Sequence, residues 1–251
     1  MWSHWLDQVR TVYDARARIP FDGHTNAKEV DRCVGVVSRV APALDSRVCD
    51  IGCGTGWHLK ELAQRGYSRL YGLDVSLGSL EIAAQRCADT PAIFIWGDVG
   101  AAGLTAAFDV VTIFGAALGS GSRDYDLTFL RSAASLLAND GTLVLSYIPL
   151  ELASRHVGTF DVAYCVSSAV TVSSDVKLRS DLGVLEIRQK IGETVLPTEE
   201  LCLYSEKEMT LLMEQAGMVI APSSLSTLQA ERLECDDYLG WMIARRCGGQ
   251  H

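Results

Sequence analysis

Three aspartates are placed at equal intervals in the chain. Asp50, Asp74 and Asp98 are 24 residues apart, and each ends an apolar run. The first is followed by a glycine-rich loop, because the chain reads D-I-G-C-G-T-G from Asp50 to Gly56. Carboxylates accept hydrogen bonds and attract positive charge, and closely spaced glycines let the backbone approach a ligand where any Cβ would collide. Together these residues predict a ligand site with negative charge beside a glycine loop.

The interval between the aspartates predicts the elements that position them. Twenty-four residues accommodate about one strand, one helix and two short loops, so we expect βα units whose strands end in carboxylates at one edge of a sheet. Open α/β sheets bind nucleotides at that edge. Strands and helices continue to alternate, which predicts a parallel sheet. The expected strands are 47–51, 69–73, 92–96, 108–114, 142–148, 218–220 and 238–245, and the expected helices include 57–65 and 77–87.

Two segments depart from this alternation. Residues 1–23 carry apolar side chains at near-helical spacing, which predicts an amphipathic helix followed by a loop. Residues 160–204 alternate between apolar and polar side chains, which predicts an antiparallel β insertion after the fifth strand. The tripeptide Asn139-Asp140-Gly141 has the composition of a turn, and we expect it to lead into the fifth strand.

The length of 251 residues suits one α/β domain with an elaboration. We therefore expect a single domain over 1–251. Within it, residues 1–23 form a lid, 24–149 the ligand-binding core, 150–204 a β insertion that caps the substrate, and 205–251 the rest of the core.

The charge pattern separates two classes of nucleotide site. A dinucleotide-binding loop reads G-x-G-x-x-G and holds a pyrophosphate at a helix N-terminus. Here the loop reads D-x-G-x-G-x-G, with Asp50 two residues before the first glycine. A carboxylate in that place repels pyrophosphate but favours a ligand that carries an ammonium and a sulfonium. The loop therefore favours S-adenosylmethionine over NAD.

With Asp74 and Asp98 in place, the loop resembles the cofactor site of class I S-adenosylmethionine-dependent methyltransferases. The stretches G-L-D-V-S at 72–76 and L-Y-S-E-K-E at 203–208 are similar to the small-molecule branch, which includes glycine-type and amino-sugar N-methyltransferases. The resemblance implies a Rossmann-like α/β fold. Its seven-stranded, mostly parallel sheet has helices on both faces and an antiparallel last strand, with an N-terminal helical lid and an antiparallel β insertion after strand five.

The resemblance also implies roles for single residues. Asp74 is expected to accept hydrogen bonds from both ribose hydroxyls, and Asp98 to accept one from the adenine amino group. Val75, Val99 and Phe114 are expected to form apolar walls for the ring. The expected cofactor-binding residues are Asp50, Gly52, Cys53, Gly54, Gly56, Asp74, Val75, Asp98, Val99 and Phe114.

Two residues are candidates for a catalytic role. Tyr13 falls where such enzymes often carry a lid tyrosine, near the methionine end of the cofactor, and His156 lies in the expected insertion, from which it can reach a substrate. His58 falls in the first turn of the helix after the glycine loop, and we assign it a structural role. The motifs identify no general base.

The expected reaction follows from the cofactor. The methyl group on a sulfonium is already activated, so transfer chiefly requires a nucleophile held in line at about 3–3.5 Å in a dry pocket. We expect methyl transfer to a nitrogen or oxygen of a small-molecule metabolite, such as a natural-product intermediate, with S-adenosylhomocysteine as product. One alternative is intramolecular cyclisation or elimination of the cofactor, or a cyclisation without methyl transfer. Another is a dehydrogenase or a non-catalytic nucleotide-binding module.

Composition restricts the partners. A net charge of -9 and a pI near 5.0 give no basic footprint for nucleic acid. No stretch approaches the roughly 20 apolar residues that span a bilayer, and the first residues do not read as a secretion signal, so we expect a cytoplasmic protein. The eight cysteines contain no C-x-x-C pair, and we expect reduced thiols and no metal. A homodimer remains open.

Overall fold

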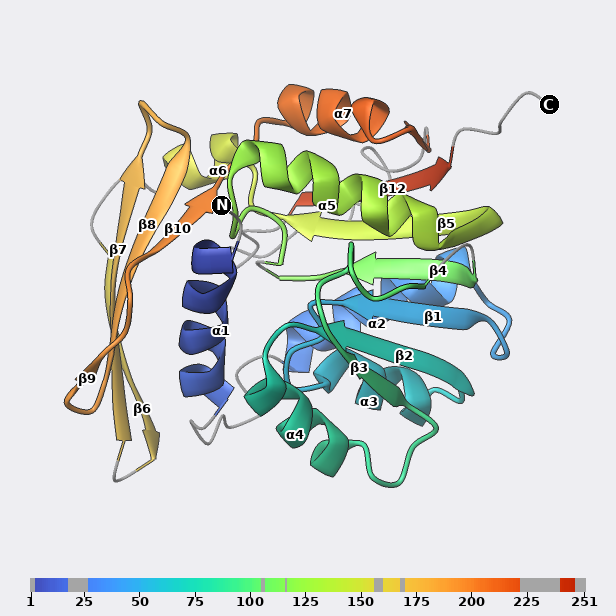
Figure 1. Ribbon diagram of the computed structural model, residues 1–251, viewed down its shortest axis with the longest axis horizontal. Coiled ribbons are helices and arrows are strands. Elements are labelled where there is room, and N and C mark those ends of the chain that lie inside the picture. Colours follow the sequence, from blue (N-terminus) through green and yellow to red (C-terminus); the bar gives the residue numbers. More distant parts are fainter. Residues whose placement is uncertain are drawn as a thin grey trace.

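The structure is a computed structural model that describes residues 3–17, 27–104, 107–115, 117–155, 160–167, 170–221 and 240–246. Its described residues form two sheets (Figure 1). The larger sheet has seven strands in the order β11-β12-β5-β4-β1-β2-β3. The strands are β1 (Arg47–Ile51), β2 (Arg69–Asp74), β3 (Ile93–Trp96), β4 (Phe108–Ile113), β5 (Leu137–Tyr147), β11 (Met218–Ile220) and β12 (Gly240–Arg246).

Strand directions agree with the sequence-based fold. Strands β1 to β5 pair in parallel, whereas β12 is antiparallel to both of its neighbours, β5 and β11. The expected mostly parallel seven-stranded sheet with an antiparallel last strand is confirmed. Because the carboxyl ends of β1 to β4 meet at one edge, the loops that follow these strands come together there.

Helices cover both faces of this sheet (Figure 1). One core lies between the sheet and helices α5 and α7, and the other lies between the sheet and helices α2 and α3. Burial on both faces explains why the central strands read as continuous apolar runs. The helices around the sheet are α2 (Ala27–Val40), α3 (Trp57–Gln64), α4 (Leu77–Arg86), α5 (Arg123–Leu136) and α7 (Glu206–Gln215).

Serine caps begin three of these helices. Ser76 accepts a hydrogen bond from the Ser79 amide at the start of α4, and Ser122 caps α5 in the same way. At α7, Ser205 and Glu208 form the reciprocal capping box that the sequence predicts. These caps fix where each helix starts relative to the strand end before it.

A second, antiparallel sheet follows the short helix α6 (Leu150–Arg155). We call it the insertion sheet; its strands are β6 (Phe160–Ser167), β7 (Val170–Arg179), β8 (Val184–Ile191), β9 (Thr194–Val195) and β10 (Glu199–Cys202). The expected antiparallel insertion is confirmed, and α6 was not expected. Helix α1 (Ser3–Ala17) stands between the insertion sheet and the large sheet (Figure 1), and we call this helix the lid after the expectation for residues 1–23.

The residues expected to form a turn, Asn139-Asp140-Gly141, fall inside the bounds of β5, which begins at Leu137 rather than at Thr142. Pairing with β4 is irregular there, because Leu137 pairs with Phe108 and Thr142 with Val110, so four residues of β5 lie opposite one of β4. A Cβ at Gly141 would come within 2.8 Å of the carbonyl oxygen of Phe108 and within 3.0 Å of the Ala138 nitrogen. The glycine therefore permits close approach both to the neighbouring strand and to the residue three positions earlier.

No helix among the described residues combines the length and the apolar character needed to cross a membrane.

Candidate functional site

A cavity of about 340 Å³ lies where the large sheet, the lid and helix α5 meet, and we call it the strand-end cavity. Nine of the twelve residues that the sequence predicts for the site line its wall. They are Tyr13, Gly52, Cys53, Gly54, Asp74, Val75, Asp98, Val99 and Phe114. The structure thus brings together residues from four strand ends and the lid.

The three loop glycines have left-handed backbones but different surroundings. At Gly52 (φ +70°) an added Cβ would lie 2.5 Å from the Cβ of Ala117, and at Gly56 (φ +80°) it would lie 3.0 Å from the Cβ of Ala83. At Gly54 (φ +52°) an added Cβ would have no atom within 4 Å. Gly52 and Gly56 therefore permit close packing inside the protein, whereas Gly54 leaves open space beside the backbone.

Asp74 is held by the backbone on both sides. The Gly54 amide donates to its Oδ2 atom and the Ser76 amide to its Oδ1 atom, each at 2.8 Å. Burial raises the pKa of the Asp74 carboxyl, although these hydrogen bonds favour the ionised form. Each carboxylate oxygen keeps a further lone pair for a ligand. The carboxylate is therefore oriented before any ligand arrives.

Asp98 has a partner that sequence reasoning missed. The Tyr125 hydroxyl donates to its Oδ2 atom at 2.5 Å, and the Gly100 amide donates to its Oδ1 atom at 2.8 Å. Burial raises the pKa of Tyr125, and the hydrogen bond to Asp98 raises it further. Tyr125 also lines the strand-end cavity. In the sequence it reads only as one apolar position on a helix face, 27 residues after Asp98.

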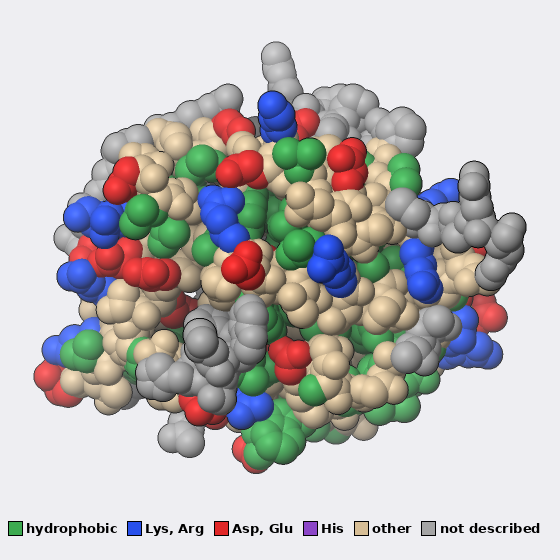
Figure 2. All heavy atoms as spheres, turned by 45° about the horizontal axis from the view of Figure 1, so that its top comes forward, with side chains coloured by type: hydrophobic (Ala, Val, Ile, Leu, Met, Phe, Trp, Pro, Cys, Tyr) green, Lys and Arg blue, Asp and Glu red, His purple; other side chains and the backbone are tan. Residues whose placement is uncertain are grey.

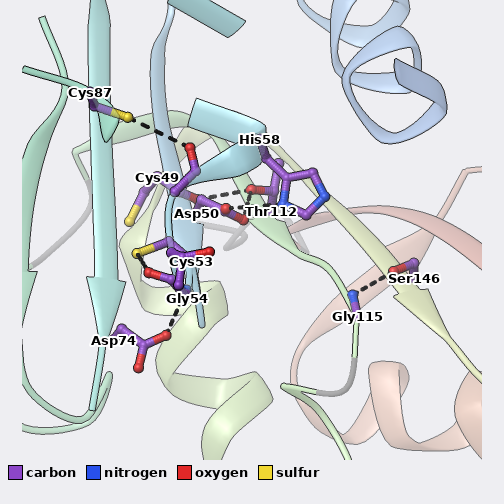
Figure 3. A network of polar contacts seen from close by, with 12 residues as sticks. Cys49, Asp50, Cys53, Gly54, His58, Asp74, Cys87, Thr112, Gly115 and Ser146 are labelled. Atoms are coloured by element: carbon purple, nitrogen blue, oxygen red, sulfur yellow. Dashed lines mark hydrogen bonds and ion pairs between the residues drawn. The ribbon is translucent and has the colours of Figure 1, made fainter. Parts of the chain in front are cut away.

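Asp50 and Gly56 do not line the strand-end cavity. Asp50 lies within β1 and is 1% exposed, with Thr112 Oγ1 donating to its Oδ1 atom at 2.6 Å. Its Oδ2 atom lies 3.6 Å from Nδ1 of His58, which does line the cavity (Figure 3). Side chains from α3 and β4 therefore cover Asp50. Its carboxylate lies behind the glycine loop and is not part of the cavity wall.

Tyr13 is the candidate catalytic residue that the structure describes, because His156 lies outside the described residues. Tyr13 lines the strand-end cavity from the lid. Burial raises the pKa of Tyr13 to about 12, with a smaller contribution from Glu199. The hydroxyl therefore keeps its proton at neutral pH.

A second cavity, of about 400 Å³, lies beside the first, and we call it the lid cavity. It is enclosed by the lid, by the loop after β4 and by strands β8 and β10 of the insertion sheet. Val9, Tyr13 and Ser120 line both cavities. The two cavities therefore meet at the lid and at the loop after β4.

Metal ligands do not gather in the described part of the chain. No group of three His, Cys, Asp or Glu side chains in it is arranged to hold an ion. The loop thiol Cys53 is buried, and burial raises its pKa well above the ordinary value. Cys53 therefore packs as a protonated, small apolar residue.

Residues 48–141 match a protein family described as methyltransferase domain. A curated relative from Streptomyces fradiae, dTDP-3-amino-3,6-dideoxy-alpha-D-glucopyranose N,N-dimethyltransferase, is 32% identical over 126 residues. That match covers 49% of this chain and 46% of the relative. The chain thus aligns with about half the length of the curated relative.

Solved structures share the fold. An S-adenosylmethionine-dependent methyltransferase from Clostridium acetobutylicum aligns with a TM-score of 0.70 at 14% identity, over 87% of this chain and 91% of its own. The CcbJ methyltransferase from Streptomyces caelestis aligns with a TM-score of 0.69 at 18% identity, over 86% of this chain and 89% of its own. CalS10, an amino pentose methyltransferase from Micromonospora echinaspora, aligns with a TM-score of 0.65 at 22% identity, over 87% of this chain and 90% of its own.

Proposed function

We propose, from the match of residues 48–141 to a methyltransferase domain and from the partial match to a curated N,N-dimethyltransferase, that this chain transfers a methyl group from S-adenosylmethionine to a nitrogen or oxygen of a small molecule. The observation that carries the proposal is the pair of oriented carboxylates, Asp74 and Asp98, in one cavity wall with the glycine loop. Bound there, S-adenosylmethionine supplies an activated methyl group, and S-adenosylhomocysteine is the product.

The strand-end cavity fits this cofactor by its chemistry. Asp74 offers lone pairs on both oxygens to vicinal hydroxyls, and Asp98 offers an acceptor to an amino group beside the apolar side chain of Val99. Asp50 adds negative charge behind the loop, and its Oδ2 atom is buried without a hydrogen-bond partner among the described residues. Negative charge on three sides favours a cationic ligand over a pyrophosphate.

We assign the acceptor to the lid cavity, because Val9, Tyr13 and Ser120 line both cavities. A molecule held in the lid cavity can therefore meet the cofactor at this boundary. Apolar side chains such as Val12 and Leu201 form part of the lid cavity wall, and the protonated Tyr13 hydroxyl is suited to donate a hydrogen bond that orients the acceptor. Positioning of this kind is the main requirement for an in-line displacement.

An amino sugar is the first acceptor class to test, since the curated relative is named for an amino-sugar N,N-dimethylation. No described feature favours cyclisation or elimination of the cofactor, or hydride transfer, and we do not propose them.

We propose that residues 1–251 form a single domain with the lid, core and insertion boundaries given above, and that the protein acts in the cytoplasm. Neither nucleic acid nor a membrane is a proposed partner. On the face shown in Figure 2, acidic and basic side chains are intermingled among the described residues, which supports the exclusion of nucleic acid.

The experiment that tests the proposal is an end-product assay. The protein is incubated with S-adenosylmethionine and a panel of amino sugars that includes dTDP-3-amino-3,6-dideoxy-α-D-glucopyranose, and products are identified by mass. The proposal expects a methylated acceptor and S-adenosylhomocysteine in equal amounts for a singly methylated product. Methylthioadenosine, or a product without an added methyl group, would contradict it.

A further inference from the structure

Arg16, in the last turn of the lid, binds the insertion sheet through three hydrogen bonds. Its Nε atom donates to Oε1 of Gln189 at 2.6 Å, its Nη1 atom donates to Oε1 of Glu199 at 3.3 Å, and its Nη2 atom donates to Oε2 of Glu199. Gln189 continues the network, because its Nε2 atom donates to Ser174 Oγ at 2.8 Å. Both charged side chains are largely shielded, with 25% of Arg16 and 15% of Glu199 exposed. A planar guanidinium with both its terminal nitrogens on one carboxylate is a directional contact, so it fixes orientation as well as distance.

Arg16 also contacts the residue at the boundary between the two cavities. Its guanidinium carbon lies 5.1 Å from the ring centroid of Tyr13, one helical turn earlier on the same face of the lid. The pKa of Tyr13 is raised first by burial and then by Glu199 from the insertion sheet; Arg16 lowers it, and Asp74 from the cofactor side raises it. Tyr13 therefore lies within electrostatic range of charged groups in both cavities, and the Arg16 guanidinium lies over its ring.

A separate anchor attaches the lid to the start of helix α4. Oδ1 of Asp14 accepts hydrogen bonds from Ser76 Oγ at 2.6 Å and from the Gly78 amide at 3.0 Å, at the start of α4. The Ser76 amide in turn donates to Asp74. Asp14 is the next residue after Tyr13, so it points about 100° away from it around the helix. The lid thus has one anchor beside the cofactor carboxylate and another in the wall of the lid cavity.

We infer that Arg16 is a positioning residue: by its bond to Glu199 it ties the lid to the insertion sheet and so holds Tyr13 at the boundary where the acceptor meets the cofactor. The kinetic consequence of this inference rests on the proposed function, whereas the contact between Arg16 and Glu199 does not depend on that function. Both members of the ion pair line the lid cavity. Loss of the pair should therefore weaken acceptor use and leave the cofactor carboxylates in place.

The first test measures hydrogen–deuterium exchange of residues 3–17 in the full chain without ligands. Arg16→Gln and Glu199→Gln should each raise exchange in the lid about tenfold. Arg16→Lys keeps the positive charge but lacks the planar guanidinium, so its lid exchange should lie between that of the unsubstituted protein and that of Arg16→Gln. The double variant Arg16→Glu with Glu199→Arg should return to within about threefold of the unsubstituted protein. Arg188→Gln is the matched control, because Arg188 pairs with Glu186 inside the insertion sheet and should leave the lid unchanged.

The second test separates acceptor from cofactor. With dTDP-3-amino-3,6-dideoxy-α-D-glucopyranose as acceptor, Arg16→Gln should raise the acceptor KM about tenfold, change kcat less than threefold, and leave the Kd for S-adenosylhomocysteine within about twofold. Asp14→Ala should instead weaken S-adenosylhomocysteine binding. A purely structural role for Arg16 would lower the melting temperature and change both ligands together.

Three results would overturn the inference: unchanged lid exchange in both single variants, a double variant that exchanges as fast as the single variants, or an Arg16→Gln protein that loses acceptor and S-adenosylhomocysteine binding together. If the unsubstituted protein methylates no acceptor in the panel, the proposed function fails, and the exchange measurements still decide whether the tie exists.

Discussion

The backbone amide of Gly54 donates a hydrogen bond to Oδ2 of Asp74 at 2.8 Å, which joins the loop after β1 to the end of β2. The Ser76 amide holds the other carboxylate oxygen at the same distance. The glycine loop and the second aspartate of the sequence pattern therefore form one unit, and the carboxylate needs little reorganisation to receive a ligand.

Substitution of Asp74 should weaken the cofactor site without unfolding it. Asp74→Ala removes a charged acceptor of hydrogen bonds, so we expect a loss of roughly 1.5–3 kcal/mol in the binding of S-adenosylhomocysteine, measured by calorimetry. Asp109→Ala is the matched control. Asp109 pairs with Arg47 at the amino-terminal ends of β4 and β1, away from the strand-end cavity. Equal affinities for the Asp74 variant and the unsubstituted protein would exclude Asp74 from the site.

Two glycines of the same loop should respond differently to alanine. Both have left-handed backbones, so each substitution costs about 1 kcal/mol of backbone strain. Gly52→Ala also creates a 2.5 Å contact with the Cβ of Ala117, whereas Gly54→Ala has open space beside it. In thermal unfolding, Gly52→Ala should therefore be the less stable protein, and Gly54→Ala should remain folded but bind S-adenosylhomocysteine weakly. The reverse order of stabilities would contradict this account of the loop.

The bond between Tyr125 and Asp98 should contribute to stability. Tyr125→Phe removes the donor to Oδ2 of Asp98, and hydrogen bonds to charged groups are worth roughly 1.5–3 kcal/mol. We expect a lower free energy of unfolding in urea and a smaller loss of cofactor affinity than Asp98→Ala causes. Tyr71→Phe serves as the control, because its described aromatic contact is ring to ring with Phe108. A Tyr125 variant as stable as this control would show that the bond contributes nothing.

Asp126 should make stability depend on pH. Burial raises its pKa from 3.8 to about 6, despite hydrogen bonds from the Tyr204 hydroxyl at 2.5 Å and the Gly119 amide at 3.1 Å. The folded protein thus binds the proton more tightly than the unfolded chain. This contribution is present below about pH 4, is lost as the pH rises to about 6, and is constant above that. It amounts to roughly 2–3 kcal/mol.

The measurement compares urea unfolding of the unsubstituted protein and Asp126→Asn at several pH values. Asparagine does not titrate, so the stability of the unsubstituted protein relative to the variant should fall between pH 4 and pH 6 and then level off. Parallel pH profiles would place the pKa of Asp126 near its ordinary value.

Much of the fold is predictable from the chain because its signals are local. Strand ends marked by Asp50, Asp74 and Asp98 and the serine caps at Ser76 and Ser205 all lie where the sequence predicts them. Each signal depends on residues within one strand or one helical turn, so no knowledge of packing is needed.

The parts that could not be predicted depend on contacts between distant segments. The pairs Arg16–Glu199 and Tyr125–Asp98 join residues 183 and 27 positions apart, and no local pattern marks them. The exclusion of Asp50 from the cavity wall depends on how α3 and β4 cover β1. The tripeptide that ends at Gly141 does not by itself show where β5 begins, because the irregular pairing there depends on the register of β4 and β5. His156 stays a prediction.

The central claim is that carboxylates at the ends of adjacent parallel strands bind a cationic adenosyl ligand. Its most direct test is a calorimetric titration of the purified protein with S-adenosylmethionine and S-adenosylhomocysteine, repeated with Asp74→Ala. We predict one binding site per chain for each ligand in the unsubstituted protein and affinities at least tenfold weaker in the variant. A protein that binds neither ligand, or a variant that binds both as tightly, would contradict the claim.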